Sequence, residues 1–135
     1  MASTSEIVIT LPGRRRVDAQ LGRHRVRTDQ PVDGGGEDTA PSPFQIFLAA
    51  IGTCAGIFVQ GFCAKRDIPY DGIRILERPK YDEAGTLVAV DLDIEVPPGF
   101  PEKYREALVR VADQCSVKRA IHAQPVFQVR AVTRP

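Results

Sequence analysis

A run of twenty-one residues without a charged side chain, Phe44–Ala64, is the feature that most limits how this chain can fold. A helix of that length would span the hydrocarbon core of a bilayer. Ser42 is a suitable N-cap for such a helix, and Pro43 suits its first position. The run therefore predicts one long helix over 42–66. Two of the three cysteines lie in it, so the helix is a membrane span, a buried core helix or the frame of a thiol site.

The rest of the chain favours a buried helix in a soluble protein. It is dominated by amphipathic patterns that need a soluble core, and the loops beside the run show no charge asymmetry that would set a membrane topology. The N-terminal sequence MASTSEIVIT lacks the basic head and long apolar run of a secretory signal. We therefore expect a cytoplasmic protein without a membrane partner.

A helical wheel separates the two cysteines of this run. At about 100° per residue, Gly52 and Gly56 share a small and polar face with Cys63. Cys54 lies on the opposite face, among bulkier side chains. A Gly-x-x-x-Gly pair allows another backbone to approach closely. We expect that partner to be the second helix of the chain, or the same helix of a second subunit.

The remaining patterns predict an α+β protein with antiparallel sheet. Alternating apolar and polar residues indicate strands, and apolar residues at helical spacing, Cys115 among them, indicate a second helix. The length of 135 residues, with 43% hydrophobic and 26% charged residues, is typical of one globular domain, 1–135. Its predicted elements are a β meander (5–29), a Gly/Pro loop (30–41), the central helix (42–66), a β hairpin (72–96), the second helix (101–121) and a last strand (125–132).

Charge and cysteine spacing exclude several classes of function. The net charge of +1 gives no general attraction to an acidic partner. The arginines of the meander have no aromatic residues between them on which bases could stack, so we expect no nucleic acid. Cysteine spacings of nine and fifty-two match neither a secreted disulfide framework nor a zinc site. We expect no metal and no cofactor. In the cytosol a disulfide is more often catalytic than structural.

Two motifs in this order resemble one known family. PSPFQIFLAAIGTC, followed about sixty residues later by ADQCSVKRAI, is similar to the OsmC/Ohr family of osmotically inducible and organic hydroperoxide resistance proteins. The resemblance covers nearly the whole chain and is closest to the OsmC-like branch. It implies an intertwined homodimer with the central helices packed together and an active site at each subunit interface. It also implies a thiol peroxidase that reduces organic hydroperoxides in oxidative stress defence, reset by a lipoylated or thioredoxin-like dithiol reductant.

The resemblance assigns the cysteines their roles. Cys54 matches the peroxidatic position, where a thiolate attacks the O–O bond and becomes a sulfenic acid. Cys115 matches the resolving position, where a second thiol traps the sulfenic acid as a disulfide. Cys63 points away from Cys54 on the wheel, so we interpret it as a packing residue.

The family also supplies an arginine from the meander, held by a carboxylate that follows the helix-opening proline. Arg14–Arg16 contains the candidates, and we assign Arg16. This chain has Phe44 where the carboxylate is expected, so Glu37 or Asp38 of the loop is the expected substitute. The lost carboxylate favours a second hypothesis, a non-catalytic dimer of the same fold that binds a small apolar ligand. The retained cysteine pair favours the peroxidase.

Overall fold

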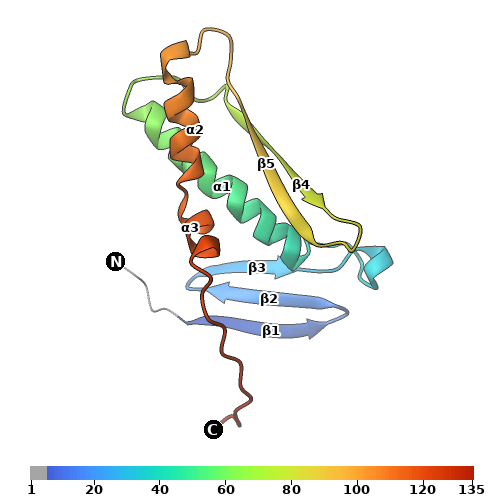
Figure 1. Cartoon of the computed structure of the whole chain (residues 1–135). Coiled ribbons are helices and arrows are strands. Elements are labelled where there is room, and N and C mark those ends of the chain that lie inside the picture. Colours follow the sequence, from blue (N-terminus) through green and yellow to red (C-terminus); the bar gives the residue numbers. More distant parts are fainter. Residues whose placement is uncertain (1–5) are drawn as a thin grey trace. The chain divides into compact units, whose positions relative to one another are not determined.

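The computed structural model describes residues 6–135, and they form an α+β protein with antiparallel sheets and helices (Figure 1). This confirms the predicted fold class. Residue 5, the predicted start of the meander, lies outside the described residues. The chain divides into two compact units, one ending at Ala49 and the other beginning at Ala50, and the single domain stays a prediction. The long helix α1 (Pro43–Ala64) begins in the first unit and continues into the second.

The first unit contains a three-stranded antiparallel sheet in the order β1-β2-β3. Its strands are β1 (Ile7–Gly13), β2 (Arg16–Leu21) and β3 (His24–Thr28). The turn between the first two strands lies at Arg14 and Arg15. Gly13 pairs with Arg16, and the two residues between them, Arg14 and Arg15, have φ values of 57° and 70°. Positive φ at both central positions gives the backbone twist that suits a tight hairpin.

The loop that follows the sheet is tied down by a buried carboxylate. Asp29 accepts hydrogen bonds from the Thr39 hydroxyl at 2.6 Å, the Thr39 N–H at 3.0 Å and the Gln30 N–H at 2.7 Å. These hydrogen bonds lower the pKa of Asp29 from 3.8 to about 2, and the bond from the Thr39 side chain contributes most. A short 3-10 turn, η1 (Val32–Gly34), lies inside the loop. The loop is therefore an ordered structure built around one ionised side chain.

The second unit packs the hairpin of β4 and β5, together with the helix α2, against α1 (Figure 1). Its elements after α1 are β4 (Arg74–Tyr81), β5 (Leu87–Glu95), η2 (Glu102–Tyr104), α2 (Arg105–Asp113) and α3 (Ser116–His122). Buried residues from α1, α2 and the loop after β5 form its core: Ala55, Val59, Phe62, Cys63, Phe100, Leu108 and Ala112. The unit therefore holds all three cysteines of the chain.

The glycine face of α1 packs against β4 of the same chain, not against another helix as predicted. A Cβ atom added to Gly56 would lie 3.9 Å from Ile75, and one added to Gly52 would collide with the Glu77 carboxylate. Burial raises the pKa of Glu77, opposed by a hydrogen bond with the Gly52 backbone. Within the described residues, the buried Oε2 of Glu77 has no hydrogen-bond partner. The glycines thus make room for a carboxyl group that faces the helix.

The predicted second helix, 101–121, is broken. The α2 helix ends at Asp113, and α3 starts at Ser116. Between them Cys115 has an extended backbone, with φ −65° and ψ 150°, and its sulfur accepts the Lys118 N–H at 3.4 Å. The apolar period that includes Cys115 does place it in the interior, where it is fully buried. The helical spacing of the apolar residues did not predict that Cys115 would be the N-cap of a new helix.

The structure also differs from the prediction at the expected last strand, 125–132. Residues 123–135 form no helix or strand in the described chain. Val126, Phe127, Val129 and Val132 are between 78% and 96% exposed. The alternating pattern predicts an extended segment, but neither sheet includes it, so it pairs with no strand among residues 6–135. Four large apolar side chains are left in solvent.

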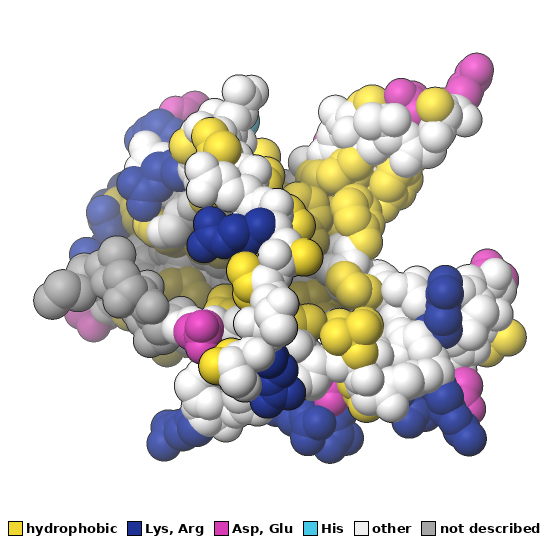
Figure 2. Space-filling model, turned by 90° about the horizontal axis from the view of Figure 1, so that it is seen from below, with side chains coloured by type: hydrophobic (Ala, Val, Ile, Leu, Met, Phe, Trp, Pro, Cys, Tyr) yellow, Lys and Arg dark blue, Asp and Glu magenta, His cyan; other side chains and the backbone are white. Residues whose placement is uncertain are grey.

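The α1 helix is long and apolar enough to cross a membrane by length and composition, although a core helix of a soluble protein has the same properties. Only 28% of its most apolar window is buried within this chain. Several other large apolar side chains are exposed as well, among them Ile7, Ile9 and Leu11 of β1. Hydrophobic side chains gather openly on the face shown in Figure 2. One copy of the chain therefore leaves much apolar surface uncovered.

Candidate functional site

The structure brings Cys54 and Cys115 together. Cys54 is half-buried on α1, and Cys115 is fully buried at the break between α2 and α3. Both are free thiols, and the side chain of Cys115 hydrogen-bonds with that of Cys54. Two thiols in hydrogen-bonding contact are candidates to form a disulfide on oxidation.

The break before α3 supplies backbone donors to Cys54. The first N–H groups of a helix have no acceptor within the helix. In α3, the N–H groups of Val117 and Ser116 donate hydrogen bonds to the Cys54 sulfur. An uninterrupted helix would have used these donors internally, so the interruption creates the surroundings of the sulfur.

These surroundings favour the thiolate of Cys54. Burial works to raise its pKa, but the hydrogen bonds from Val117, Cys115 and Ser116 and the positive charge of Arg119 outweigh burial. The pKa of Cys54 is therefore lowered from its ordinary 9.0. Cys63 behaves in the opposite way: it is fully buried in the core, and burial raises its pKa despite the charge of Arg66. The contrast is consistent with Cys63 as a packing residue.

Arg119 is the member of the site that sequence reasoning missed. It lies one turn after Cys115, and its backbone N–H donates to the Cys115 carbonyl at 3.1 Å. Its guanidinium is held near the start of α3 by a 3.4 Å hydrogen bond to the Ser116 hydroxyl. The signal that could have found it is a basic residue four positions after a cysteine that caps a helix. That signal is visible only once the helix break is known.

The meander arginine is held by a carboxylate, as expected, and that carboxylate belongs to Glu37 and not to Asp38. Arg16 donates to Glu37 at 3.0 Å and lies 3.9 Å from Asp29. Arg14 contacts the same Glu37 carboxylate at 3.5 Å. These residues all belong to the first unit and the cysteine pair to the second. A catalytic role for Arg16 stays a prediction.

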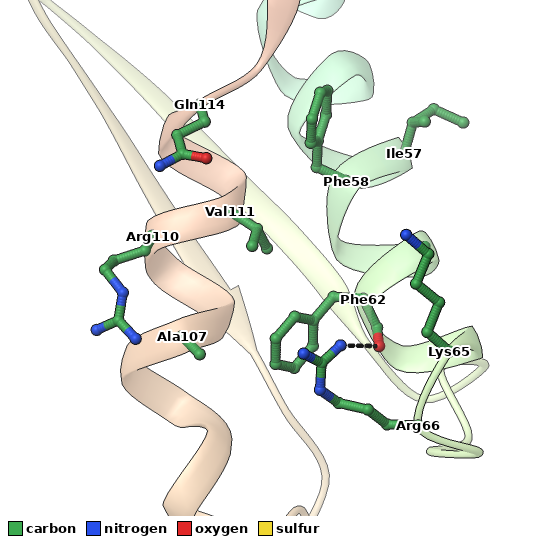
Figure 3. Close-up of a pocket in the computed structure, with 10 residues that line it drawn as sticks. Ile57, Phe58, Phe62, Lys65, Arg66, Ala107, Arg110, Val111 and Gln114 are labelled. Atoms are coloured by element: carbon green, nitrogen blue, oxygen red, sulfur yellow. Dashed lines mark hydrogen bonds between the residues drawn. The ribbon is translucent and has the colours of Figure 1, made fainter.

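A cavity of about 490 Å³ lies between α1 and α2 (Figure 3). Its lining is largely apolar, with three basic residues and no acidic one. The lining residues are Ile57, Phe58, Gly61, Phe62, Lys65, Arg66, Ala107, Arg110, Val111 and Gln114. A space of this size is within the range of small-molecule sites, about 300–1,000 Å³.

A metal centre has no support among the residues that are described. Across residues 6–135, no group of three or more histidine, cysteine or acidic side chains is placed to hold an ion. His24 is on β3 and His122 at the end of α3, in different units. The chemistry available at the cysteine pair is that of two thiols.

Comparison with known proteins gives the family. A Psychrobacter arcticus 273-4 protein named for osmotic stress induction and detoxification has a TM-score of 0.76 and 19% identity over 90% of this chain and 91% of its own. An OsmC-like protein of Mycoplasma pneumoniae has a TM-score of 0.71 and 13% identity over 92% and 91%. The organic hydroperoxide resistance protein OsmC of Legionella pneumophila has a TM-score of 0.57 and 23% identity over 89% and 91%.

These similarities show a shared fold. No curated protein sequence matches the chain. The sequence model of the family described as OsmC-like protein, however, matches residues 35–130, which is more than half of the chain and includes both Cys54 and Cys115. The chain belongs to the OsmC-like protein family.

Proposed function

We propose that the protein is a thiol-dependent reductase of organic hydroperoxides that acts in oxidative stress defence. The observation that carries the proposal is the Cys54 sulfur, held by two backbone N–H groups and by the thiol of Cys115. A peroxide-reducing cysteine needs a stabilised thiolate and a second thiol within reach. Proteins of the same fold from Legionella pneumophila and Elizabethkingia anophelis are named for organic hydroperoxide resistance, which supports the same reading.

The proposed reaction has three steps. The Cys54 thiolate attacks the outer oxygen of R–O–OH, the O–O bond breaks, and the leaving alkoxide takes up a proton to give an alcohol. Cys54 is then a sulfenic acid, oxidised by two electrons. The Cys115 thiol attacks its sulfur, a disulfide forms, and water leaves. A lipoylated or thioredoxin-like dithiol restores both thiols by exchange and becomes a disulfide itself.

The proposal includes a homodimer in the cytoplasm. Only 28% of the most apolar window of α1 is buried within one chain, and four large apolar side chains of the segment 125–132 are in solvent. Burial of such surface against a second copy would be strongly favourable, at roughly 25 cal/mol for each Å². The cytosol keeps thiols reduced, which the first step requires.

A second candidate function is binding of a small apolar ligand by a non-catalytic dimer. Two observations favour it: the apolar cavity between α1 and α2, and Phe44 at the position where the family carries a carboxylate. In that case the cysteines are incidental.

The deciding experiment is steady-state consumption of cumene hydroperoxide by the full chain, with dihydrolipoamide or a thioredoxin system as the reductant. We expect turnover in the wild type and none in Cys54→Ser. Cys115→Ser should consume one equivalent and stop at a trappable sulfenic acid, and Cys63→Ser should retain activity. A folded wild-type protein that consumes no hydroperoxide with either reductant would exclude the reductase and leave the ligand-binding function.

A further inference from the structure

One face of the sheet β1-β2-β3 gathers arginines around a buried carboxylate. In the register of β2 with β3, Arg27 lies opposite Asp18, and Arg25 lies opposite Gln20. Residues that lie opposite each other in an antiparallel pair are on the same face, as are residues two apart along one strand. Arg16 and Asp18 of β2 therefore share one face with both of these arginines of β3.

A cavity of about 390 Å³ is bounded by these four charged residues and lies within the first unit. Its other lining residues are Pro12, Thr28, Thr39 and Ala40. Both hydroxyl groups already donate, that of Thr28 to the Val17 carbonyl at 2.5 Å and that of Thr39 to Asp29 at 2.6 Å. The guanidinium groups are therefore the side-chain donors that remain in the lining.

The carboxylate in the lining is already engaged by a cation of the chain itself. Asp18 is only 7% exposed, and Arg25 donates a hydrogen bond to it at 2.7 Å. Arg25 keeps further donors, because a guanidinium carries several N–H groups and this contact uses one of them. The pair therefore leaves N–H donors to the cavity and no unpaired acidic group among its lining residues.

Two of the arginines have donors without an acceptor. Among the ion pairs of residues 6–135, none involves Arg27. The Nε atom of Arg16 is buried, and no residue in the described part of the chain accepts a hydrogen bond from it. The Asp29 carboxylate is 3.9 Å from this atom, which is too far for a hydrogen bond. Because a buried donor without an acceptor is unfavourable, the cavity favours an acceptor from outside the chain.

A solvated strand face is the competing explanation. It accounts for the side chain of Arg25, which is 53% exposed, and for its pairing with Asp18. It accounts neither for the buried Nε of Arg16 nor for a cavity that three arginines line together. An anion with several oxygen atoms would use both of these features.

We propose that this cavity binds a small phosphate monoester, whose phosphate group accepts hydrogen bonds from Arg25, Arg27 and the Nε of Arg16. Guanidinium groups bind phosphate oxygens through paired N–H donors. A carboxylate has too few oxygens for three arginines, whereas a phosphate monoester has a terminal oxygen for each of them. The phosphate group also carries a charge of about −1.5 to −2 at pH 7, which suits an arginine that has no carboxylate partner.

The volume of the cavity limits the organic part of the ligand. About 390 Å³ is near the lower end of the range of small-molecule sites, about 300–1,000 Å³. Pro12 and Ala40 are the apolar residues of the lining, so a short organic group would contact them. The ligand is therefore a phosphorylated compound with few carbon atoms. This inference goes beyond the proposed function and does not depend on it, because the cysteines belong to the second unit.

Calorimetric titration of the full-length, reduced protein with α-glycerophosphate tests the site. A phosphate-free buffer of about 0.15 M ionic strength largely screens weak attraction between exposed charges. We expect α-glycerophosphate to bind with a Kd of about 1 mM or lower, and glycerol not to bind. Arg27→Ala should weaken binding at least tenfold, about 1.4 kcal/mol, and Arg27→Lys should recover part of the loss.

Arg23→Ala is the matched control. Arg23 lies in the turn between β2 and β3, is exposed, and is not part of the cavity lining. This variant loses the same charge from the same strand pair, and it should bind α-glycerophosphate like the wild type. Arg16 is left unchanged in these tests, because a role at Cys54 is predicted for it.

Three results would overturn the inference. The first is a folded wild-type protein that does not bind α-glycerophosphate. The second is equal weakening in Arg23→Ala and Arg27→Ala, which would show a general attraction to the basic strands. The third is binding to phosphatidate vesicles without binding of α-glycerophosphate, which would assign the arginines to a membrane surface. A wild-type protein that binds α-glycerophosphate but consumes no hydroperoxide would overturn the proposed function alone.

Discussion

The Cys115 thiol serves two neighbours: it hydrogen-bonds with Cys54, and it accepts the Lys118 N–H at 3.4 Å. The residue that interrupts the second helical segment is therefore both the cap of α3 and the partner of the proposed nucleophile. Removal of the break would take away the donors that stabilise the thiolate. The local fold and the chemistry of the site depend on the same sulfur atom.

The ionisation of Cys54 gives the first prediction. The rate of alkylation of Cys54 by iodoacetamide should reach half its maximum below pH 9.0, because the hydrogen bonds to its sulfur and the charge of Arg119 outweigh burial and lower its pKa. Arg119→Gln should move the Cys54 profile to higher pH, and Arg119→Lys should leave most of the shift. Mass spectrometry resolves the cysteines. A Cys54 profile that does not respond to Arg119→Gln would contradict the proposed role of that charge.

The same shift has a consequence for folding. A thiol with a lower pKa in the folded chain than in the unfolded chain favours the folded state when it ionises. The contribution of Cys54 is therefore complete above its unfolded pKa and is lost as the pH falls through its folded pKa. The difference in unfolding free energy between wild type and Cys54→Ser should change in the wild type's favour between neutral and alkaline pH.

The second prediction concerns disulfide connectivity. One equivalent of cumene hydroperoxide should convert Cys54 and Cys115 to an intramolecular disulfide, because their side chains are hydrogen-bonded in the reduced protein. Cys63, buried in the core, should then be alkylated only after denaturation. Peptide mapping under non-reducing conditions gives the answer, and a bridge that contains Cys63 would refute the pairing.

The third prediction tests the meander arginine. Glu37→Gln removes the carboxylate that holds Arg16 at 3.0 Å, whereas Asp38→Asn changes a neighbour that makes no such pair. If Arg16 acts on the Cys54 thiolate, Glu37→Gln should lower kcat/KM for hydroperoxide several-fold, and Asp38→Asn should not. Steady-state assays of both variants suffice. Equal activity in Glu37→Gln and wild type would limit Arg16 to a structural role in the loop.

The fourth prediction concerns the carboxyl group that faces α1. Burial raises the pKa of Glu77, so the folded state disfavours its charged form. The resulting loss of stability is absent below the unfolded pKa and grows as the pH rises from there through the folded pKa. Glu77→Gln should therefore be more stable than the wild type at pH 7, with the difference vanishing at acidic pH. Urea unfolding at several pH values measures this. A constant difference would show that the charge is not responsible.

The fifth prediction concerns the C-terminal segment. Val129 is 96% exposed in a stretch that joins no sheet of the part of the chain that the structure describes. If this stretch pairs with a second copy, Val129→Asp should weaken dimerisation at least tenfold, about 1.4 kcal/mol. Sedimentation equilibrium compares it with Gln128→Asp, which introduces the same charge at a polar position. A wild-type protein that sediments as a soluble monomer at micromolar concentration would contradict the dimer.

Much of the fold could be predicted from local patterns. The uncharged run, with Ser42 and Pro43 before it, gave α1 to within two residues at each end. The alternation of apolar and polar residues predicted a hairpin over 72–96, and β4 and β5 both lie within it. These features follow from periodicity and from turn chemistry, which a single sequence contains.

The remaining features depend on contacts that are distant in sequence. No glycine or proline marks the break at Gln114 and Cys115, so local turn chemistry could not predict it. The glycines of α1 did not predict which element would pack against them, because either a strand or a helix can pack closely against small residues. The cysteine pair could be found only through family resemblance, and Arg119 only through the structure.

Oxidation of the cysteine pair would weaken α3 itself. Once Cys115 is in a disulfide, its sulfur must follow Cys54 and is a poorer acceptor for the Lys118 N–H. The α3 helix has only seven residues and depends on its cap. Its amide protons should exchange with solvent faster in the oxidised protein than in the reduced one, while those of α1 keep their protection. Local opening of α3 would thus expose the disulfide to the reductant at the stage when it has to be reduced.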